Sequence, residues 1–180
     1  MNATHERDMS AIAEALVHRF RLMTEDDLER VLEIERDSYR FPWTRKNFLS
    51  CLQAGYCCWL MECRGQLDGY GIMAVTGNEA HVLNLCIRLA VRRGGLGRTM
   101  LLNLLSVAAS RRACRIILET RLSNTAALGL YRSAGFRAVR LRENYYPAAN
   151  GNREDALELS RELRRDSSLP RFRKPPAVPL

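Results

Sequence analysis

The sequence predicts one domain of the α/β (α+β) class. Three strand-like apolar runs joined by short turns fill residues 56–89, and two helical patterns precede them. A glycine-rich segment then leads into a long apolar helix, after which further strands and a helix follow. A chain of 180 residues suits a single domain with a full hydrophobic core.

The first elements are a strand and two helices. Alternating side chains predict a strand over residues 20–23. Thr24 and Asp27 form a capping-box pattern that starts a helix, with Asp in place of the usual Glu or Gln. After a loop broken by Pro42, Thr44 can cap a second helix. Side chains at helical spacing are Leu28, Val31, Leu32 and Glu35 in the first helix, and Phe48, Leu49 and Leu52 in the second.

The centre of the chain reads as three strands, at residues 56–63, 68–76 and 79–89. The turns between them are short, which predicts an antiparallel meander. The next helix runs from Gly95 to about Ala113. The last one is capped by Ser123 and ends near Ala134, with Gly135 at the C′ position. The remaining strands are expected at residues 115–120, 136–144 and 155–161.

The predicted domain covers residues 20–163. Residues 1–19 are expected to be an extension, and residues 164–180, with four prolines and few core-forming side chains, a disordered tail. No apolar stretch reaches the roughly 18 residues that a membrane span needs. The start of the chain is polar, which excludes a secretory signal. We therefore expect a cytoplasmic protein with no membrane partner, acting as a monomer.

Cysteine and charge usage narrow the function classes. The chain has no Cys-x-x-Cys pair and no histidine at zinc-ligand spacing from a cysteine, so we expect reduced buried cysteines and no metal. The net charge is +8, and all but two of the 28 basic residues are arginine. We interpret this charge as support for an anionic cofactor, without direct nucleic-acid binding. The six cysteines are Cys51, Cys57, Cys58, Cys63, Cys86 and Cys114.

Residues 92–98, Arg-Arg-Gly-Gly-Leu-Gly-Arg, are the most informative segment. Glycine has no Cβ, so a ligand can approach the backbone closely. The unpaired N–H groups and the dipole at the start of the next helix favour an anion, most often a phosphate. The spacing excludes Gly-x-x-x-x-Gly-Lys-Ser/Thr and Gly-x-Gly-x-x-Gly. A plain strand-to-helix turn is the alternative.

Four further motifs occur downstream and upstream of this loop. They are Phe-Pro-Trp at 41–43, Leu-Glu-x-Arg-x-Ser-Asn at 118–124, Leu-Tyr-x-x-x-Gly-Phe at 130–136 and Asn-Tyr-Tyr-Pro at 144–147. With the glycine loop they resemble the GNAT acyltransferases, and more closely the bacterial ribosomal-protein alanine N-acetyltransferases of the RimI type. The resemblance spans about residues 20–163. It implies the GNAT fold, a mixed, twisted central sheet with helices on both faces, splayed near residues 86–89.

The resemblance also implies acetyl-CoA as co-substrate. Backbone groups of Leu85, Cys86 and Ile87 would bind the pantetheine arm and acyl carbonyl, and the side chain of Asn124 would contact the cofactor. From the residues alone, 85–87 can equally be core strand and Asn124 a helix cap. The family has a proline where this chain has Leu89, so the start of the loop is expected to differ. The implied pyrophosphate loop is Arg93, Gly94, Gly95, Leu96, Gly97 and Arg98.

Two side chains carry the implied chemistry. By resemblance, Glu119 is the general base that deprotonates the substrate amine, and Tyr131 is the general acid that protonates the leaving thiolate of coenzyme A. The alternatives are a Glu119 that pairs with Arg121 or Arg115 and a Tyr131 that fills the core. An α-amine, with a pKa about 2.5 units below that of lysine, costs about 3.4 kcal/mol less to deprotonate, so a carboxylate is a sufficient base.

Aromatic residues flank this constellation. Tyr145, Tyr146 and Pro147 are expected to form a substrate-facing loop by resemblance, and Phe41 and Trp43 could line the opposite wall; surface or core packing are the alternatives. The implied function is transfer of acetyl from acetyl-CoA to a protein N-terminal amine, the alanine of a small-subunit ribosomal protein. Rival functions are acetylation of a lysine, polyamine or small amine, and a non-catalytic acyl-CoA-binding module.

Overall fold

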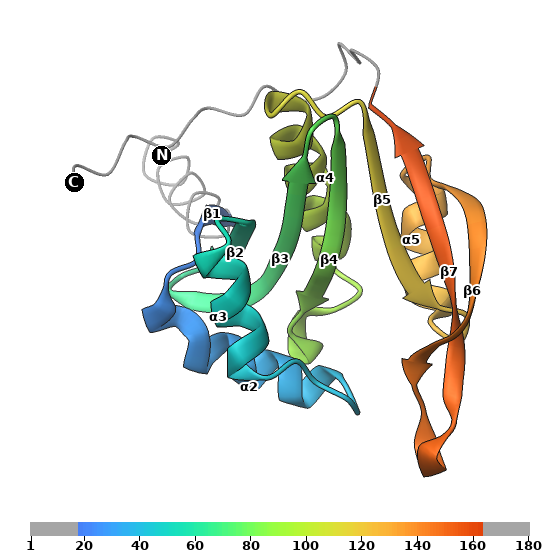
Figure 1. Cartoon of the computed structure of the whole chain (residues 1–180). Coiled ribbons are helices and arrows are strands. Elements are labelled where there is room, and N and C mark those ends of the chain that lie inside the picture. Colours follow the sequence, from blue (N-terminus) through green and yellow to red (C-terminus); the bar gives the residue numbers. More distant parts are fainter. Residues whose placement is uncertain (1–17, 164–180) are drawn as a thin grey trace, which may run out of the picture.

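The computed structural model describes residues 18–163, which form a seven-stranded sheet with helices on both faces (Figure 1). The strands are β1 Arg19–Leu22, β2 Cys57–Cys63, β3 Gln66–Thr76, β4 Glu79–Ile87, β5 Arg115–Arg121, β6 Arg137–Pro147 and β7 Arg153–Glu162. The helices are α2 Leu28–Ser38, α3 Arg45–Gln53, α4 Leu96–Ser110 and α5 Thr125–Ser133, with 3₁₀ turns η1 Glu25–Asp27, η2 Leu89–Val91 and η3 Ala149–Gly151. Apart from residues 18 and 19, the predicted extension and tail lie outside the described residues.

The sheet is mixed, as expected. Its strand order is β1-β2-β3-β4-β5-β7-β6, and within the described residues β4 and β5 are its parallel neighbours. The predicted meander is confirmed, because β2, β3 and β4 pair antiparallel in sequence order. The right-hand part of Figure 1 shows β5, β7 and β6 as a second group of strands beside this meander.

Strands β4 and β5 separate partway along their length. They pair over four residues, the last pair being Val82–Leu118, and then diverge (Figure 1). The register of β3 against β4 shifts at the same level and leaves Leu83 as an extra residue in β4. Such a bulge bends a strand and increases its twist. The predicted splay is therefore present, but it starts at residue 83 rather than near residues 86–89.

Two hydrophobic layers hold the helices to the sheet. Helices α4 and α5 pack on one face through side chains such as Met100, Leu104 and Leu128, and α2 and α3 pack on the other through Leu28 and Phe48. Strand side chains alternate between the two layers, as strand geometry requires. All six cysteines are free; four are buried within these layers, whereas Cys63 is half-buried and Cys114 is exposed, contrary to the expectation that all are buried.

Several predicted boundaries differ from the structure; the strand predicted at 79–89, for example, ends at Ile87, before the turn η2. Three other differences have a local cause. Helix α4 ends at Ser110 rather than near Ala113, because Arg112 turns into the left-handed region with φ of 64° and its N–H bonds the Ala109 carbonyl. Asn124, not Ser123, is the N-cap of α5, and its Oδ1 accepts from the Ala127 N–H at 3.1 Å. Strand β6 continues to residue 147 past an irregularity at Asn144, so the aromatic segment predicted as a loop is strand.

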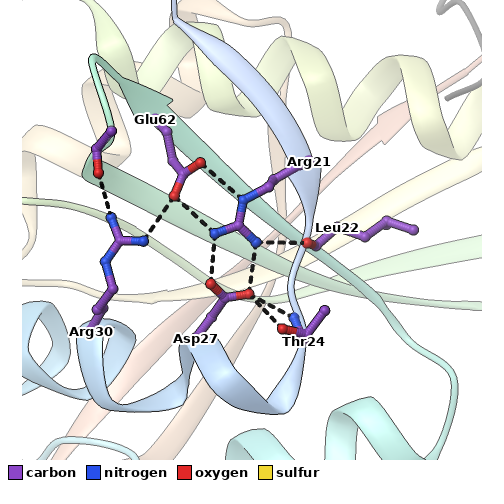
Figure 2. A network of polar contacts seen from close by, with 7 residues as sticks. Arg21, Leu22, Thr24, Asp27, Arg30 and Glu62 are labelled. Carbon is purple, nitrogen blue, oxygen red and sulfur yellow. Dashed lines mark hydrogen bonds and ion pairs between the residues drawn. The ribbon is translucent and has the colours of Figure 1, made fainter.

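A polar network ties β1, the start of α2 and β2 together (Figure 2). The Arg21 guanidinium donates to both carboxylate oxygens of Asp27, at 2.7 and 2.6 Å, and to both of Glu62, at 2.9 Å. Asp27 also accepts from the Thr24 N–H at 2.8 Å, which confirms the predicted capping box. These bonds, above all those from Arg21, lower the pKa of Asp27 from 3.8 to about 2.

The depressed pKa makes Asp27 a source of pH-dependent stability. The stabilisation is present above the unfolded-state pKa near 4 and is lost as the pH falls through about 2. Asp27→Asn should lower the free energy of unfolding by about 1–2 kcal/mol at pH 7, since Arg21 is partly exposed to solvent, and by progressively less below pH 4. Urea titrations of both proteins at pH 7 and pH 3 measure the difference. The exposed neighbour Asp26→Asn is the control, and a deficit equal at both pH values would contradict the assignment.

Candidate active site

A cleft of about 880 Å³ opens where β4 and β5 diverge. Its walls come from β4, the glycine loop and first turn of α4, the end of β5, α5, the segment after α2, and the end of β6. Of the predicted catalytic and cofactor-binding residues, Gly94 alone lies outside this lining. Those that line the cleft are Leu85, Cys86, Ile87, Arg93, Gly95, Leu96, Gly97, Arg98, Glu119, Asn124 and Tyr131.

The glycine loop presents the N-terminus of α4 to the cleft. Gly95 is the N-cap, with φ of 81°, a conformation that glycine adopts without strain. Helix α4 is 15 residues long, so its first N–H groups and its dipole favour an anion here, beside the guanidinium groups of Arg93 and Arg98. Leu89 starts the short turn η2 before the loop.

The strand segment before the loop is held by two side chains, Tyr39 after α2 and Arg92 after η2. The Tyr39 hydroxyl donates to the Leu85 carbonyl at 3.2 Å, and the Arg92 Nε donates to the Ile87 carbonyl at 2.7 Å. Burial raises the pKa of the Cys86 thiol, which excludes it as a ready nucleophile. Sequence reasoning missed both donors, because Tyr39 and Arg92 reach β4 only in the folded chain.

Glu119 lies at the end of β5 with its side chain 6% exposed. Its Oε2 is 2.6 Å from Nε2 of His81, and its Oε1 is 3.3 Å from Nη2 of Arg142. Burial acts to raise the pKa of Glu119, but the hydrogen bond and charge of His81 and the charge of Arg142 outweigh it, so the pKa lies below its ordinary value. The carboxylate is therefore ionised at neutral pH and able to accept a proton.

The alternative partners considered for Glu119 are engaged elsewhere. Arg115 forms an ion pair with Glu79, and Arg121 forms one with Glu154 at 2.9 Å. The alternative that Glu119 pairs with Arg121 or Arg115 is therefore wrong. The true contact with His81 joins positions 38 residues apart and depends on the β4–β5 register, so no local pattern could indicate it.

Tyr131 is buried in the last turns of α5, with its ring 5.8 Å from that of Phe136. The helix ends near Ala134 with Gly135 at C′, as predicted; the φ of Gly135 is 84°, and the Phe136 N–H donates to the Tyr131 carbonyl at 3.0 Å. This C-terminal motif brings the two rings together. Burial raises the pKa of Tyr131 to about 12, so the phenol keeps its proton at neutral pH.

Aromatic side chains form the outer walls of the cleft. Phe41, Trp43 and Tyr146 line it, whereas Tyr145 does not. The Tyr146 hydroxyl donates to the Glu119 carbonyl at 3.1 Å, and the Arg121 guanidinium lies 4.6 Å from the Tyr146 ring centre. The expected substrate-facing role thus fits Tyr146 geometrically and does not fit Tyr145.

Glu35 is a buried carboxyl group that sequence reasoning left without a role. It is 1% exposed and accepts hydrogen bonds from the Trp43 N–H at 2.8 Å and from the Tyr70 hydroxyl. Burial raises its pKa. These bonds fix the segment after α2 as one wall of the cleft. Its position at helical spacing from the apolar residues of α2 is the sequence feature that could have predicted its burial.

A second group of polar side chains lies away from the cleft. His18, Cys63 and Asp68 place one potential ligand atom each within 4.8 Å of one another, which their sequence spacing does not predict. Asp68 is also held by the Arg88 guanidinium at 2.6 Å and by His18 at 3.1 Å. The positive charge of Arg88 already balances the buried carboxylate, so we interpret the group as an ion-pair network.

Across residues 18–163, no helix is long and apolar enough to cross a membrane.

Comparisons with known proteins all point to one family of acetyltransferases. Residues 28–136 match the model of the acetyltransferase (GNAT) family. The [ribosomal protein bS18]-alanine N-acetyltransferase of Escherichia coli K12 is 36% identical over 134 residues, which is 74% of this chain and 90% of that protein. The enzyme of the same name from Salmonella typhimurium LT2 is 33% identical over 139 residues, 77% of this chain and 93% of that one.

Solved structures agree with these relatives. The crystal structure of the Escherichia coli ribosomal-protein-S18-alanine N-acetyltransferase superposes with a TM-score of 0.77 at 31% identity, covering 87% of this chain and all of that one. Ard1 from Thermoplasma volcanium shares the fold, with a TM-score of 0.74 at 21% identity, covering 82% and 98% of the two chains. The match to the family model covers more than half of the chain, and the Escherichia coli K12 enzyme is more than 30% identical to it. The chain therefore belongs to the GNAT acetyltransferase family.

Proposed function

We propose that the protein transfers acetyl from acetyl-CoA to the N-terminal α-amine of a protein, and that its substrate is the N-terminal alanine of a small-subunit ribosomal protein. The observation that carries the proposal is one cleft with three features: the N-terminus of α4, an ionised carboxylate at Glu119 and a protonated phenol at Tyr131. The names of the relatives support the choice of substrate. A ribosomal substrate supports the further proposal that the protein acts in the cytoplasm.

The first turn of α4 and the arginines beside it are proposed to hold the pyrophosphate of acetyl-CoA. The proposed site continues along β4, where Leu85, Cys86 and Ile87 line the cleft. Asn124 also lines the cleft, although its side chain caps α5. Acetyl-CoA supplies the activated acyl group as a thioester. The residues of this chain orient it, exclude water from it, and move the protons that the transfer requires.

The proposed chemistry is direct transfer to the bound amine. Glu119 accepts a proton from the substrate ammonium group, and the neutral amine attacks the thioester carbonyl. The C–S bond then breaks as the attacking nitrogen loses its second proton. The departing sulfur, held by a hydrogen bond from the Tyr131 hydroxyl, takes up one proton, so the products are the amide and the thiol of coenzyme A. A buried phenol with a pKa of about 12 is a weak acid, so it acts by a hydrogen bond that strengthens as thiolate charge develops.

The pyrophosphate assignment predicts a charge effect at Gly97. A Cβ on Gly97 would lie at an ordinary distance, 3.4 Å, from the Leu130 Cδ2, so a Cβ at this position meets no clash. Gly97→Asp should raise the Michaelis constant for acetyl-CoA at least tenfold, because a carboxylate would face the phosphates. Initial rates at varied acetyl-CoA concentrations provide the measurement. Gly97→Asn has the same shape without the charge; an equal effect of both variants would remove the electrostatic assignment.

The proposed substrate is tested in cells that make and lack this protein. Mass spectrometry of the ribosomal protein N-termini should find one acetylated alanine terminus that depends on the protein and on an intact Glu119. If every ribosomal N-terminus has the same acetylation in both cell lines, the ribosomal substrate is wrong.

A further inference from the structure

Glu119 is the first residue of β5 beyond its ladder with β4. The last Cα pair of that ladder is Val82–Leu118, so within the described residues Glu119 has no pairing partner on β4. On its other side Glu119 pairs with Glu158 of β7. Carboxylates directly opposite each other on neighbouring strands repel. The backbone therefore holds the proposed base on one side only, beside a like charge.

A histidine of β4 reaches across the split between the two strands. His81 is paired with Ile117 in their register, and Glu119 lies two residues further along β5, so both side chains project from the same face of the sheet. Nε2 of His81 is 2.6 Å from Oε2 of Glu119. An ionised carboxylate oxygen offers only lone pairs, so the proton of this short bond lies on Nε2 and His81 is the donor. The imidazolium and the neutral ring with its proton on Nε2 both supply this donor.

The other groups around the carboxylate do not replace this donor. The Arg142 guanidinium of β6 lies 3.3 Å from Oε1 of Glu119 but 2.7 Å from the Glu158 carboxylate, so it compensates the two like charges together. The Tyr146 hydroxyl donates to the backbone carbonyl of Glu119 and not to its side chain. Burial raises the pKa of Tyr145, which is therefore a neutral phenol. Among the described residues, the histidine makes the short bond to the base.

We propose that His81 is a positioning residue that holds the Glu119 carboxylate in place for catalysis; this inference rests on the proposed function of Glu119 as base. Glu119 lines the cleft and His81 does not, so the imidazole supports the carboxylate from behind and touches no substrate. Each carboxylate oxygen keeps a further lone pair for the substrate ammonium. The bond also favours the charged form of the carboxylate, in line with the lowered pKa of Glu119.

The test compares His81→Leu and His81→Gln with wild type. Leucine has no donor, so His81→Leu should lower kcat about tenfold at pH 7.5 through misplacement of the base, and should leave the Michaelis constant for acetyl-CoA unchanged. The acidic limb of its kcat profile should move to higher pH, because Glu119 loses a bond that favours its charged form. His81→Gln keeps a side-chain N–H donor and should keep kcat within about threefold of wild type.

Two further variants isolate the route of the effect. In a Glu119→Gln background, His81→Leu should cause no further loss of kcat, because the histidine acts only through that carboxylate. His18→Leu removes another histidine–carboxylate contact, to Asp68 at 3.1 Å, away from the cleft. This matched control should have the kcat of wild type.

Three results would overturn the positioning role. They are a wild-type kcat with an unmoved acidic limb in His81→Leu, equal losses in His81→Leu and His81→Gln, and a further loss in the Glu119→Gln background. Rates are measured on whichever amine the wild type acetylates fastest among an alanine-initiated peptide, a lysine peptide with a blocked N-terminus and a polyamine. Wild-type turnover in Glu119→Gln itself would instead remove the base and the proposed chemistry, so the two failures are distinguishable.

Discussion

Glu119→Gln should lower kcat by roughly 10²–10⁴-fold while acetyl-CoA binding stays unchanged. Glutamine keeps the size of the side chain but cannot accept the proton of the substrate ammonium. The fold should persist, since Arg142 keeps its pairing with Glu158 in the variant. Steady-state kinetics with an alanine-initiated peptide, together with calorimetric binding of acetyl-CoA, separate the two effects.

The pH dependence of this loss identifies its cause. An α-amine has a pKa of about 7.7–8.0, so above that range the substrate is already neutral and needs a base less. The deficit of Glu119→Gln should therefore shrink as the pH rises to 9. A deficit of constant size at all pH values would mean that Glu119 has a structural role. Glu79→Gln, a substitution at a partly exposed ion pair on β4, controls for loss of a carboxylate from this sheet.

Tyr131→Phe should lower kcat about a hundredfold, with little change in the binding of either substrate. The substitution removes one oxygen and leaves the ring packed 5.8 Å from Phe136. A phenol that merely fills the core would leave turnover almost unchanged and would affect stability slightly. The comparison requires conditions in which chemistry limits the rate, verified by single-turnover measurements.

The matched control for this variant is Tyr145→Phe. Tyr145 is 39% exposed and does not line the cleft, so its hydroxyl should be dispensable. Wild-type turnover in Tyr131→Phe would remove the phenol from the mechanism. Equal losses in both variants would indicate a general effect of tyrosine removal on this half of the domain.

Local chemistry explains which parts of the fold the sequence predicts. The glycine loop can be predicted because its conformation depends on neighbouring residues only. Glycine permits the φ of 81° at Gly95, and α4 starts at the next residue. The same holds for Gly135, whose positive φ ends α5 and turns Phe136 back onto Tyr131. Spacing along one segment is enough information in such cases.

The missed features depend on contacts between distant segments. The pairing of His81 with Glu119 requires the short parallel ladder of β4 and β5, and the burial of Glu35 requires Tyr70 and the backbone of Trp43 to meet it. Strand β6 continues past Asn144 to Tyr146, which pairs with β7. The φ of 51° at Asn144 is typical of a turn, so the local conformation alone would end the strand there. Tertiary pairing overrides the local turn signal there.

The measurement that tests the account most directly is the site of acetylation on a single peptide that carries both an N-terminal alanine and an internal lysine. The wild-type protein, acetyl-CoA and this peptide are incubated at pH 7.5, and fragmentation mass spectrometry locates the acetyl group. We expect it on the alanine nitrogen, formed by the wild type and almost absent with Glu119→Gln. Acetylation of the lysine side chain, or equal modification by both proteins, would contradict α-amine transfer by this cleft.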